Sequence, residues 1–513
     1  MQKLPIGIQS FRQIREEGYV YVDKTDIAYR LINRYKYTFL SRPRRFGKSL
    51  FLDTLYHIFD GKKELFEGLF IYDKWDWSKS YPVIKISFGG SDFANLDITY
   101  KIALSKLKEN EQRLGIKCEN NTIPSICFKE LIHKTYEKYQ KRVVVLIDEY
   151  DKPILNNLDN PKLALENRNF LRGFYEVLKE SDEYLQFAFL TGISKFSKAS
   201  IFSGLNNIVD ISLMPEYATI CGYKQKDIEE KFKEHLKKAD LQMVKEWYNG
   251  YNFLGESVYN PFDILRFIDS GLVFDNYWWE SGNPSFLITL LKKEHYNIPE
   301  LENITIGKEL LNSFEVEKIK LEVLLFQSGY LTIKEYINDP EYGISEYRLK
   351  IPNKEVSISL NRLFFDYLTN SVKIDRNIVR ALLSENLKRF RDIFVSLFAS
   401  IPYNSYVKNN IGEYEGYYAN IFYTYLAASG LKVVAEDVTN AGRIDLSIIL
   451  KDKVYIIEFK IDKNQKSKDA LTQIKEKGYY KKYLGKDKKI YLIGITFDTK
   501  EKNISSFLWE KIG

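Results

Sequence analysis

The stretch Val454-Tyr-Ile-Ile-Glu-Phe-Lys460 is apolar except for two charged residues, Glu458 and Lys460. Such a run predicts a short buried strand. Because side chains two apart on a strand point to the same face, the carboxylate and the ammonium should project together. Two charged groups are costly to bury on a core strand unless they have a partner or a task. The stretch therefore indicates a functional site on a sheet.

A second acid, Asp445, lies thirteen residues before Glu458, in the run Gly442-Arg-Ile-Asp-Leu-Ser-Ile-Ile-Leu450. This run also alternates, so Asp445 and Ser447 share the face opposite the aliphatic residues. The polar segment Lys451-Asp-Lys453 suits a hairpin between the two strands. We therefore expect the hairpin to bring Asp445 and Glu458 together.

The order acid, turn, acid-x-Lys is typical of a metal-dependent phosphodiesterase. Asp445 and Glu458, with the carbonyl of Phe459, would supply hard oxygen ligands to Mg²⁺. The metal would activate water and neutralise charge on the scissile phosphate, and Lys460 would orient or deprotonate that water. The competing interpretation is a strand pair with an internal Asp–Lys or Glu–Lys ion pair.

The chain has 513 residues, 45% of them hydrophobic and 28% charged, which is ordinary for a globular protein of several domains. It contains no apolar run long enough to span a bilayer and no signal-peptide core, so we expect a cytoplasmic protein without a membrane segment. Three widely spaced cysteines (Cys118, Cys127 and Cys221) indicate neither a disulfide framework nor a zinc motif. The four histidines are scattered, so any metal site would consist of carboxylates, which favours Mg²⁺ or Mn²⁺ over zinc.

The positive charge is concentrated near the C-terminus. The chain carries a net charge of +7, and residues 451–513 hold 16 lysines, no arginine and 9 acidic residues, which is also +7. This surplus beside the predicted site is either a footprint for a phosphate backbone or a lysine-rich solvated surface. The first interpretation predicts a nucleic-acid partner, with DNA favoured over RNA.

A second candidate site lies near the N-terminus. The apolar run Tyr37-Thr-Phe-Leu40 leads into Ser41-Arg-Pro-Arg-Arg-Phe-Gly-Lys-Ser49, and an apolar helical segment follows. A strand, Gly-Lys-Ser and a helix form the context of a phosphate-binding loop, whose backbone N–H groups and helix N-terminus surround the phosphates. Lys48 would reach the β- and γ-phosphates, and Ser49 would bind Mg²⁺. The motif departs from the standard pattern at its first glycine, where this chain has Arg42.

A partner for this loop follows in the sequence. The apolar run Arg142-Val-Val-Val-Leu-Ile147 ends in Asp148-Glu-Tyr-Asp151, which is the Walker B pattern. Asp148 would hold the Mg²⁺ shell, and Glu149 would position or activate the attacking water. The alternative is a buried strand whose acids lie at its exposed end.

Thr191 ends the next predicted strand, Tyr184–Leu190, where such ATPases sense the γ-phosphate. Ser194 and Lys195 lie close enough to take this role instead, and a simple turn at the end of the strand is an equal alternative. Strands and helices alternate through this part of the chain, which predicts a parallel sheet. Ligands would then bind at the carboxyl ends of its strands.

The N-terminal motifs together resemble the bacterial AAA-ATPase-like family, on the segments Asp23-Lys-Thr25, Arg42-Pro-Arg-Arg-Phe-Gly-Lys-Ser-Leu50, Leu146-Ile-Asp-Glu-Tyr-Asp151, Thr191-Gly-Ile-Ser-Lys195 and Ser203-Gly-Leu-Asn-Asn207. The resemblance spans the whole chain and implies an α/β, AAA-like P-loop NTPase that uses ATP and Mg²⁺. The family tends to have the same arginine-rich loop, so Arg42 is a family trait. Gly47 would then belong to the nucleotide-binding residues, and Arg42 and Arg45 would contact either the nucleotide or a nucleic acid.

Members of that family commonly carry a C-terminal PD-(D/E)XK nuclease-superfamily domain with an α/β/α fold. The elements expected after residue 410 follow its order of helix, three strands, helix and strand. Asp445 resembles the first acid of that motif, Glu458 the second and Lys460 the lysine, while Ile444 stands where the motif has proline. Two further positions resemble the acid of the first helix and the glutamine-containing helix motif, namely Glu415 and Gln473 with Tyr479.

We expect three domains: an ATPase at 1–215, a mostly helical lid or winged-helix-like segment at 216–385, and a nuclease domain at 386–513. Within them, one amphipathic helix is predicted for 374–400, and a β-hairpin is predicted from Gly329–Ile333 and Tyr347–Pro352.

The leading functional hypothesis is an ATPase module that controls Mg²⁺-dependent cleavage of DNA, or of RNA, in defence against foreign nucleic acid. The alternative is a nucleotide-switched regulator that binds nucleic acid or protein through an inactive nuclease fold. A third hypothesis is a nuclease indifferent to ATP. A homo-oligomer is compatible with each, because many such ATPases complete their site with a neighbour's arginine.

Overall fold

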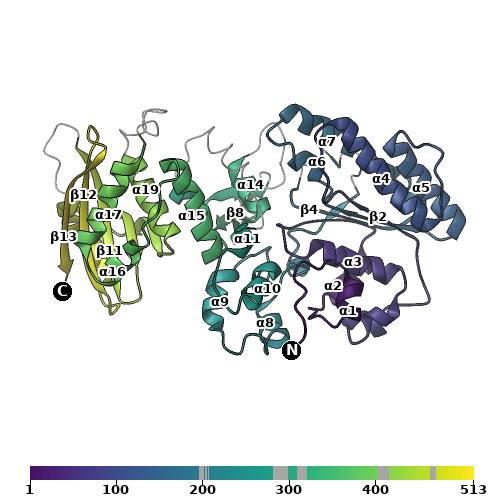
Figure 1. Cartoon of the computed structure of the whole chain (residues 1–513), viewed down its shortest axis with the longest axis horizontal. Coiled ribbons are helices and arrows are strands. Elements are labelled where there is room, and N and C mark those ends of the chain that lie inside the picture. Colours follow the sequence, from purple (N-terminus) through teal and green to yellow (C-terminus); the bar gives the residue numbers. More distant parts are fainter. Residues whose placement is uncertain are drawn as a thin grey trace. The chain divides into compact units, whose positions relative to one another are not determined.

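The computed structural model describes residues 1–195, 201–202, 205, 207–280, 298–308, 320–402, 415–462 and 470–512 (Figure 1). The chain divides into two compact units. The N-terminal unit comprises Met1–Leu290 and Ile304–Asn353, and the C-terminal unit comprises Leu291–Asn303 and Lys354–Gly513.

The N-terminal unit is built on a five-stranded parallel sheet of order β2-β3-β4-β1-β5. Every residue of β3 is buried, as its unbroken apolar run predicts for a parallel strand covered on both faces. Strand β4 lies between β1, which leads into the phosphate-binding loop, and β3, which ends in the Walker B acids. The strands are β1 Tyr37–Ser41, β2 Val83–Ser87, β3 Val143–Asp148, β4 Leu185–Gly192 and β5 Val209–Asp210.

Helices cover both faces of this sheet, as Figure 1 shows: α4, α5 and α7 lie on one face, and α1, α2 and α3 lie on the other. Side chains cap the N-termini of α1, α4 and α7; before α4, for example, the Asn95 side chain accepts a hydrogen bond from the backbone of Ile98. The helices are α1 Phe11–Glu16, α2 Thr25–Arg34, α3 Lys48–Phe59, α4 Leu96–Leu114, α5 Pro124–Tyr139, α6 Lys152–Leu155 and α7 Pro161–Glu180.

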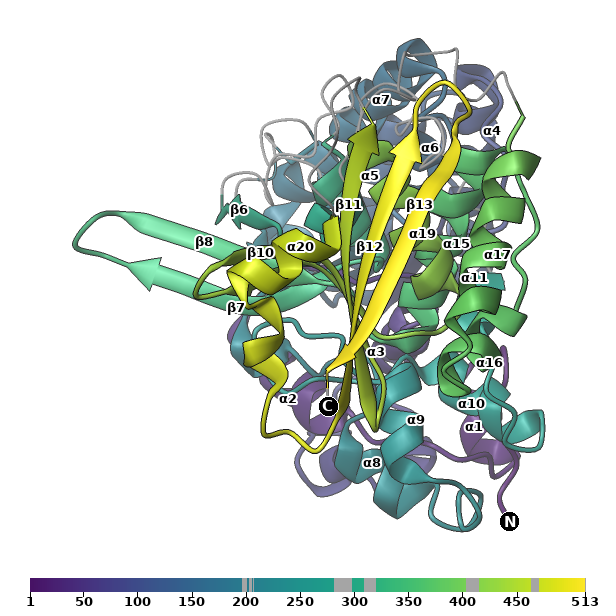
Figure 2. The ribbon, with the colours of Figure 1, turned by 90° about the vertical axis from the view of Figure 1, so that its left-hand side faces the viewer.

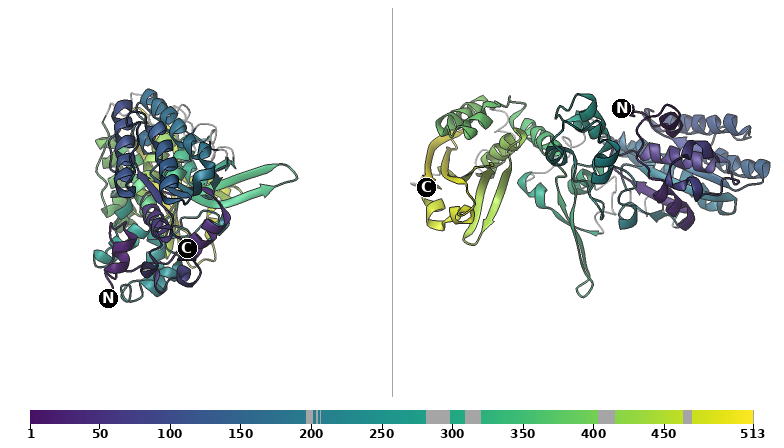
Figure 3. Two further views of the ribbon diagram at one scale, coloured as in Figure 1. Left: turned by 90° about the vertical axis from the view of Figure 1, so that its right-hand side faces the viewer. Right: turned by 90° about the horizontal axis from the view of Figure 1, so that it is seen from below.

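The rest of this unit is helical except for a three-stranded antiparallel sheet. Its β7–β8 hairpin extends away from the unit as a long ribbon (Figures 2 and 3). The predicted hairpin is therefore confirmed, but its strands are longer than expected and β6 adds a third. The elements are α8 Gln225–Lys231, α9 Leu241–Tyr248, α10 Pro261–Asp269, α11 Tyr277–Glu280, β6 Thr305–Gly307, α14 Leu321–Ser328, β7 Thr332–Asp339 and β8 Ile344–Lys350.

The C-terminal unit contains a second five-stranded sheet, of order β13-β12-β11-β10-β9. Strands β11 and β12 are parallel, and the other neighbours are antiparallel. Helix α20 packs on one face, and α17 and α19 pack on the other, which gives the expected α/β/α layers (Figure 2). The final strand, β13, is an addition to the predicted order. The strands are β9 Val433–Thr439, β10 Gly442–Ile449, β11 Lys453–Asp462, β12 Lys489–Asp498 and β13 Asn503–Ile512.

The helices of this unit are α15 Lys354–Thr369, α16 Asn377–Leu383, α17 Leu387–Ser400, α19 Glu415–Ala428 and α20 Ala470–Lys477. Because α15 packs along α19, the longer segment of the C-terminal unit begins at Lys354. Neither expected boundary, at 215 or at 385, coincides with that division. Short 3-10 helices complete the two units at Lys63–Phe66, Phe70–Asp73, Asp182–Tyr184, Pro215–Tyr217, Ile298–Asn303 and Tyr479–Tyr483.

The single helix predicted for 374–400 is wrong, because α16 and α17 are separate. The chain turns at Glu385, whose backbone adopts a left-handed conformation with φ 60°. Its carboxylate accepts hydrogen bonds from Lys453 at 3.2 Å and Lys489 at 2.7 Å, and Lys511 lies 3.8 Å away. These partners come from three different strands, so a pattern within the helical segment does not show them.

We expect Glu385→Gln to lower the melting temperature of the C-terminal unit at neutral pH. Hydrogen bonds from Lys489 and Tyr491 hold the pKa of Glu385 at about 2, below its ordinary value of 4.5. A depressed carboxyl pKa stabilises the folded state above the unfolded pKa, and that contribution is lost as the pH falls. The difference between wild type and variant should therefore shrink between about pH 4.5 and pH 2. Glu501→Gln, at an exposed turn, is the control, and a pH-independent difference in calorimetry would contradict the prediction.

Candidate functional site

The phosphate-binding loop runs from the end of β1 to the first residue of α3, Lys48. It turns through left-handed conformations at Arg45, with φ 67°, and at Gly47, with φ 93°. The Lys48 ammonium is buried and donates hydrogen bonds to the carbonyls of Arg42 and Pro43, each at 2.9 Å. Burial lowers the pKa of Lys48, and the negative charge of Asp148 opposes this shift. The ammonium thus lies at the N-terminus of α3, where the helix dipole and free N–H groups favour an anion.

Arg42 is 1% exposed, and its guanidinium donates hydrogen bonds to backbone carbonyls. It donates to Ser212 at 2.7 Å and Tyr217 at 3.2 Å, and it lies 3.9 Å from the ring centre of Phe253. Burial lowers the pKa of Arg42 to about 10, so it stays charged at neutral pH. The arginine that replaces the first glycine of the motif therefore ties the loop to residues 212–218. Arg45, in contrast, is exposed and lies 5.0 Å above the Phe262 ring.

We expect Arg42→Ala to destabilise the N-terminal unit by about 2–4 kcal/mol, because buried carbonyls that lose their donor each cost about 1–3 kcal/mol. Urea denaturation followed by tryptophan fluorescence measures this loss. Arg45→Ala removes the same charge from an exposed position of the same loop and should stay within about 0.5 kcal/mol of wild type. Equal stability of the two variants would show that the Arg42 hydrogen bonds do not hold the loop.

The Walker B acids lie beside the loop. Asp148 ends β3 and is buried, and its Oδ1 accepts a hydrogen bond from the Glu149 amide at 3.0 Å. Burial raises the pKa of Asp148, whereas a hydrogen bond with the Ser49 side chain and the charge of Lys48 lower it. The structure therefore brings Lys48, Ser49 and Asp148 together. Glu149 is half-buried, with its Oε2 3.5 Å from the ammonium of Lys152.

Thr191 is fully buried at the end of β4, and its hydroxyl donates to the carbonyl of Leu40 at 2.9 Å. This bond joins β4 to β1 beneath the phosphate-binding loop. Its competitors for the sensing role also have partners: the Ser194 hydroxyl donates to Asp151 at 2.5 Å, and Lys195 forms an ion pair with Asp210. A γ-phosphate contact would therefore require any of the three to exchange an existing partner, and the sensing role of Thr191 stays a prediction.

The sequence interpretation assigned no role to Asp151, the last acid of Asp-Glu-Tyr-Asp. Asp151 is buried and accepts hydrogen bonds from the amides of Ile193 at 3.0 Å and Ser194 at 2.6 Å. Burial raises the pKa of Asp151, and the Ser194 hydrogen bonds lower it. Asp151 therefore holds the turn after β4 against the end of β3. Thr191 comes just before that turn and Glu149 comes just after β3, so this contact helps to position both residues.

A small pocket, partly open to solvent, lies beside Gly47 and the first turn of α3. Its lining is mostly apolar and combines the phosphate-binding loop with residues 20–24 and 220–223. The lining residues include Val20, Val22, Leu50, Phe51, Ile220 and Tyr223.

In the C-terminal unit, the β10–β11 register pairs Leu446 with Ile457, which places Asp445 beside Glu458 on the neighbouring strand. Glu458 is 1% exposed. The Phe459 amide donates to Asp445 Oδ2 at 2.8 Å, and the Lys460 ammonium lies 3.6 Å from Glu458 Oε1. The hairpin predicted from the sequence therefore brings the two acids and the lysine together.

Helix α20 contributes two more groups to this cluster. Gln473 donates a hydrogen bond from its side-chain amide to Glu458 Oε1. Tyr479 lies just after the helix, and burial followed by the charge of Glu458 raises its pKa, while a hydrogen bond with Gln473 lowers it. Glu415 is the first residue of α19, but its side chain lies outside the described residues.

The donor set of this cluster consists of oxygen atoms. Asp445 and Glu458 offer carboxylates, and neither a histidine nor a cysteine accompanies them among the described residues. Hard oxygen ligands fit Mg²⁺ or Mn²⁺ and do not favour a soft metal. The residues therefore fit the cation that the sequence interpretation expects here.

These two sites define the class of protein: a P-loop ATPase-like unit joined to a nuclease-like α/β/α unit. Residues 5–202 match the family described as AAA-ATPase_like, predicted AAA-ATPase, and residues 413–507 match the PD-(D/E)XK nuclease superfamily. An "uncharacterized protein in vnfD 5'region" of Azotobacter chroococcum mcd 1 is 45% identical over 519 residues, which covers 100% of this chain and 99% of that protein. The chain belongs to the AAA-ATPase-like family with a C-terminal PD-(D/E)XK nuclease-superfamily domain, as the sequence motifs predicted. In the parts that the structure describes, no helix has the length and apolar character of a membrane span.

Proposed function

We propose that this protein binds and hydrolyses ATP in its N-terminal unit and thereby controls a Mg²⁺- or Mn²⁺-dependent nuclease in its C-terminal unit. The observation that carries the proposal is that Asp445, Lys460 and Gln473 lie around the buried carboxylate of Glu458. DNA is the favoured substrate, and a cytoplasmic role in defence against foreign DNA suits a nuclease whose activity depends on a nucleotide-controlled unit.

Each side chain of the proposed nuclease site would have a distinct role. Asp445 and Glu458 would hold the cation, which supplies a more acidic water and charge neutralisation on the scissile phosphate. Gln473 orients the Glu458 carboxylate through its hydrogen bond. Lys460, 3.6 Å from Glu458, places a positive charge where it can orient the attacking water and stabilise negative charge that develops on the phosphate.

The ATPase site assigns tasks in the same way. Lys48 would exchange the carbonyls of Arg42 and Pro43 for the β- and γ-phosphates. Ser49 and Asp148 would hold Mg²⁺, which neutralises charge on those phosphates. Glu149, which directly follows the carboxyl end of β3, would position the attacking water.

Cleavage assays on single- and double-stranded DNA and RNA, with Mg²⁺ or Mn²⁺ and with or without ATP, test the proposal. We expect cleavage of DNA that needs the divalent cation and changes with ATP. Cleavage that persists in excess chelator would overturn the metal site, and cleavage that does not respond to ATP would overturn the control by the N-terminal unit.

A second candidate function, a nucleotide-switched binding protein without cleavage, is supported by one observation. The Glu458 carboxylate already has Gln473 and Lys460 beside it, and Asp445 accepts the Phe459 amide, so both acids already interact with groups of the protein. This candidate predicts ATP-dependent binding of DNA that stays intact in both Mg²⁺ and Mn²⁺.

A further inference from the structure

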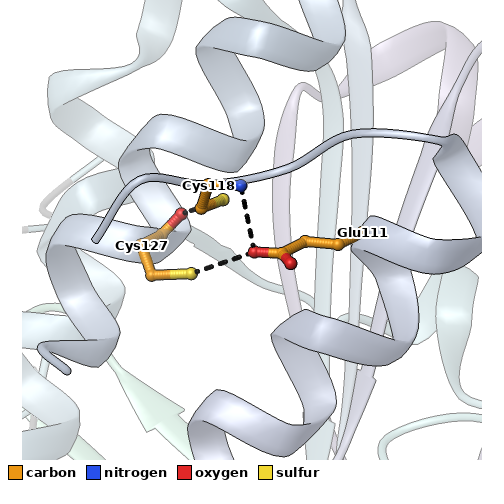
Figure 4. Close-up of side chains that lie close together, drawn as sticks. All are labelled: Glu111, Cys118 and Cys127. Carbon is orange, nitrogen blue, oxygen red and sulfur yellow. Dashed lines mark hydrogen bonds between the residues drawn. The ribbon is translucent and has the colours of Figure 1, made fainter. Parts of the chain in front are cut away.

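Three potential metal ligands, none of them assigned to either site, meet where helices α4 and α5 are joined (Figure 4). Glu111 lies in the last turn of α4, Cys118 in the connecting loop and Cys127 in the first turn of α5. One ligand atom from each lies within 4.8 Å of the others. Both cysteines are buried and free, and Glu111 is half-buried.

One separation within this cluster matches that of a tetrahedral thiolate site, and the others lie within 4.8 Å. The Cys127 sulfur lies 3.6 Å from Glu111 Oε1. With Zn–S near 2.3 Å and Zn–O near 2.1 Å, a tetrahedral zinc places its sulfur and oxygen ligands about 3.6 Å apart and two sulfurs about 3.8 Å apart. A cation could therefore bind between these side chains after small rotations rather than a movement of the backbone.

The loop that carries Cys118 is held in place by its neighbours. The Cys118 amide donates to Glu111 Oε1 at 3.3 Å, which orients the carboxylate. The amides of Glu119 and Asn120 both donate to the Glu130 carboxylate, at 2.8 and 3.1 Å. A ligand set on a fixed loop and two helices loses little conformational entropy when it binds a cation.

We propose that Glu111, Cys118 and Cys127 form a site for a thiophilic divalent cation of the zinc class, with water as the fourth ligand. Two sulfur donors favour zinc over Mg²⁺, so this site would not compete for the cation of the nuclease cluster. A bound cation would join the end of α4 to the start of α5. The spacing of eight residues between the cysteines is not that of a zinc finger, so the sequence pattern alone indicates no site.

Both thiols donate hydrogen bonds within the cluster. The Cys118 thiol donates to the Cys127 carbonyl at 3.4 Å, and the Cys127 thiol donates to Glu111. Binding would replace both thiol hydrogens and release two protons. The competing interpretation is that these hydrogen bonds are the whole function of the cluster, and it predicts no cation affinity.

Cobalt binding to the full-length protein tests the proposal. The chain is prepared metal-free under a non-chelating reductant, and Co²⁺ is added, followed by Zn²⁺. We expect a sulfur-to-cobalt charge-transfer band in the near ultraviolet, saturating at one ion per chain and displaced by Zn²⁺. This band reports thiolate ligation and is silent for carboxylate sites, so binding at the nuclease cluster does not produce it.

Matched variants complete the experiment. The Cys118→Ser, Cys127→Ser double variant should lose the band, while Cys221→Ser, which removes the remaining cysteine, should keep it. Glu111→Gln keeps an acceptor for the Cys118 amide and should weaken binding at least about tenfold, with the fold verified by circular dichroism. The proposal is overturned by a wild-type protein without the band, by a band that persists in the double variant, or by unchanged affinity in Glu111→Gln.

Discussion

Glu458→Gln should lower the rate of metal-dependent DNA cleavage at least about 10³-fold. A divalent cation contributes several kcal/mol of charge stabilisation to such a reaction, and each 1.36 kcal/mol corresponds to a factor of about ten in rate. The amide keeps the shape of the carboxylate and its acceptor for Gln473, but it removes the negative charge that would hold the cation. Initial rates of conversion of supercoiled DNA, measured across Mg²⁺ concentrations, give the effect.

The control for this prediction is Glu476→Gln, which makes the same change at an exposed position of α20. It should retain the wild-type rate. Because removal of one partner of a buried ion pair can destabilise a protein, circular dichroism verifies that Glu458→Gln is folded before the rates are compared. Cleavage by Glu458→Gln at the wild-type rate would contradict the assignment of this carboxylate, and a loss of cleavage in both variants would point to a general defect.

Much of the fold follows from local sequence. The apolar runs of β1, β3 and β4 predict buried parallel strands, and the Gly-Lys-Ser segment between a strand and a helix predicts the loop that the structure contains. Asp445 and Glu458 were predictable for a related reason. A short hairpin joins their strands, so the twofold period of each strand is enough to place both acids at one site.

The remaining features depend on contacts between distant segments. The Arg42 guanidinium binds a carbonyl 170 residues away, and no local pattern distinguishes such an arginine from one that binds a ligand. The amphipathic helical pattern is interrupted at Glu385, where lysines from strands β11, β12 and β13 surround its carboxylate. The same limitation hid the cluster of Glu111, Cys118 and Cys127, because the turn between two helices brings its members together.

Lys48→Ala should weaken ATP binding about 10- to 100-fold, because a hydrogen bond to a charged group contributes about 1.5–3 kcal/mol. ATP hydrolysis should fall by at least the same factor, since the ammonium would also stabilise charge that develops on the phosphates. This buried ammonium donates to the carbonyls of Arg42 and Pro43, so circular dichroism verifies that the variant is folded before its ATP binding is compared. Calorimetric ATP titration and phosphate release measure the two effects. Lys108→Ala, at an exposed position of α4, should match wild type in both.

The same variant separates control by ATP from the cleavage reaction itself. Lys48→Ala leaves the side chains around Glu458 unchanged, so any effect on DNA cleavage has to pass through the nucleotide state of the N-terminal unit. If ATP controls the nuclease, Lys48→Ala should cleave at one rate with and without ATP, equal to the wild-type rate without nucleotide. A nuclease indifferent to ATP instead predicts one rate for both proteins under both conditions. Retention of the full ATP response by Lys48→Ala would contradict the role of this lysine, because the response would then arise without the phosphate contact that defines the loop.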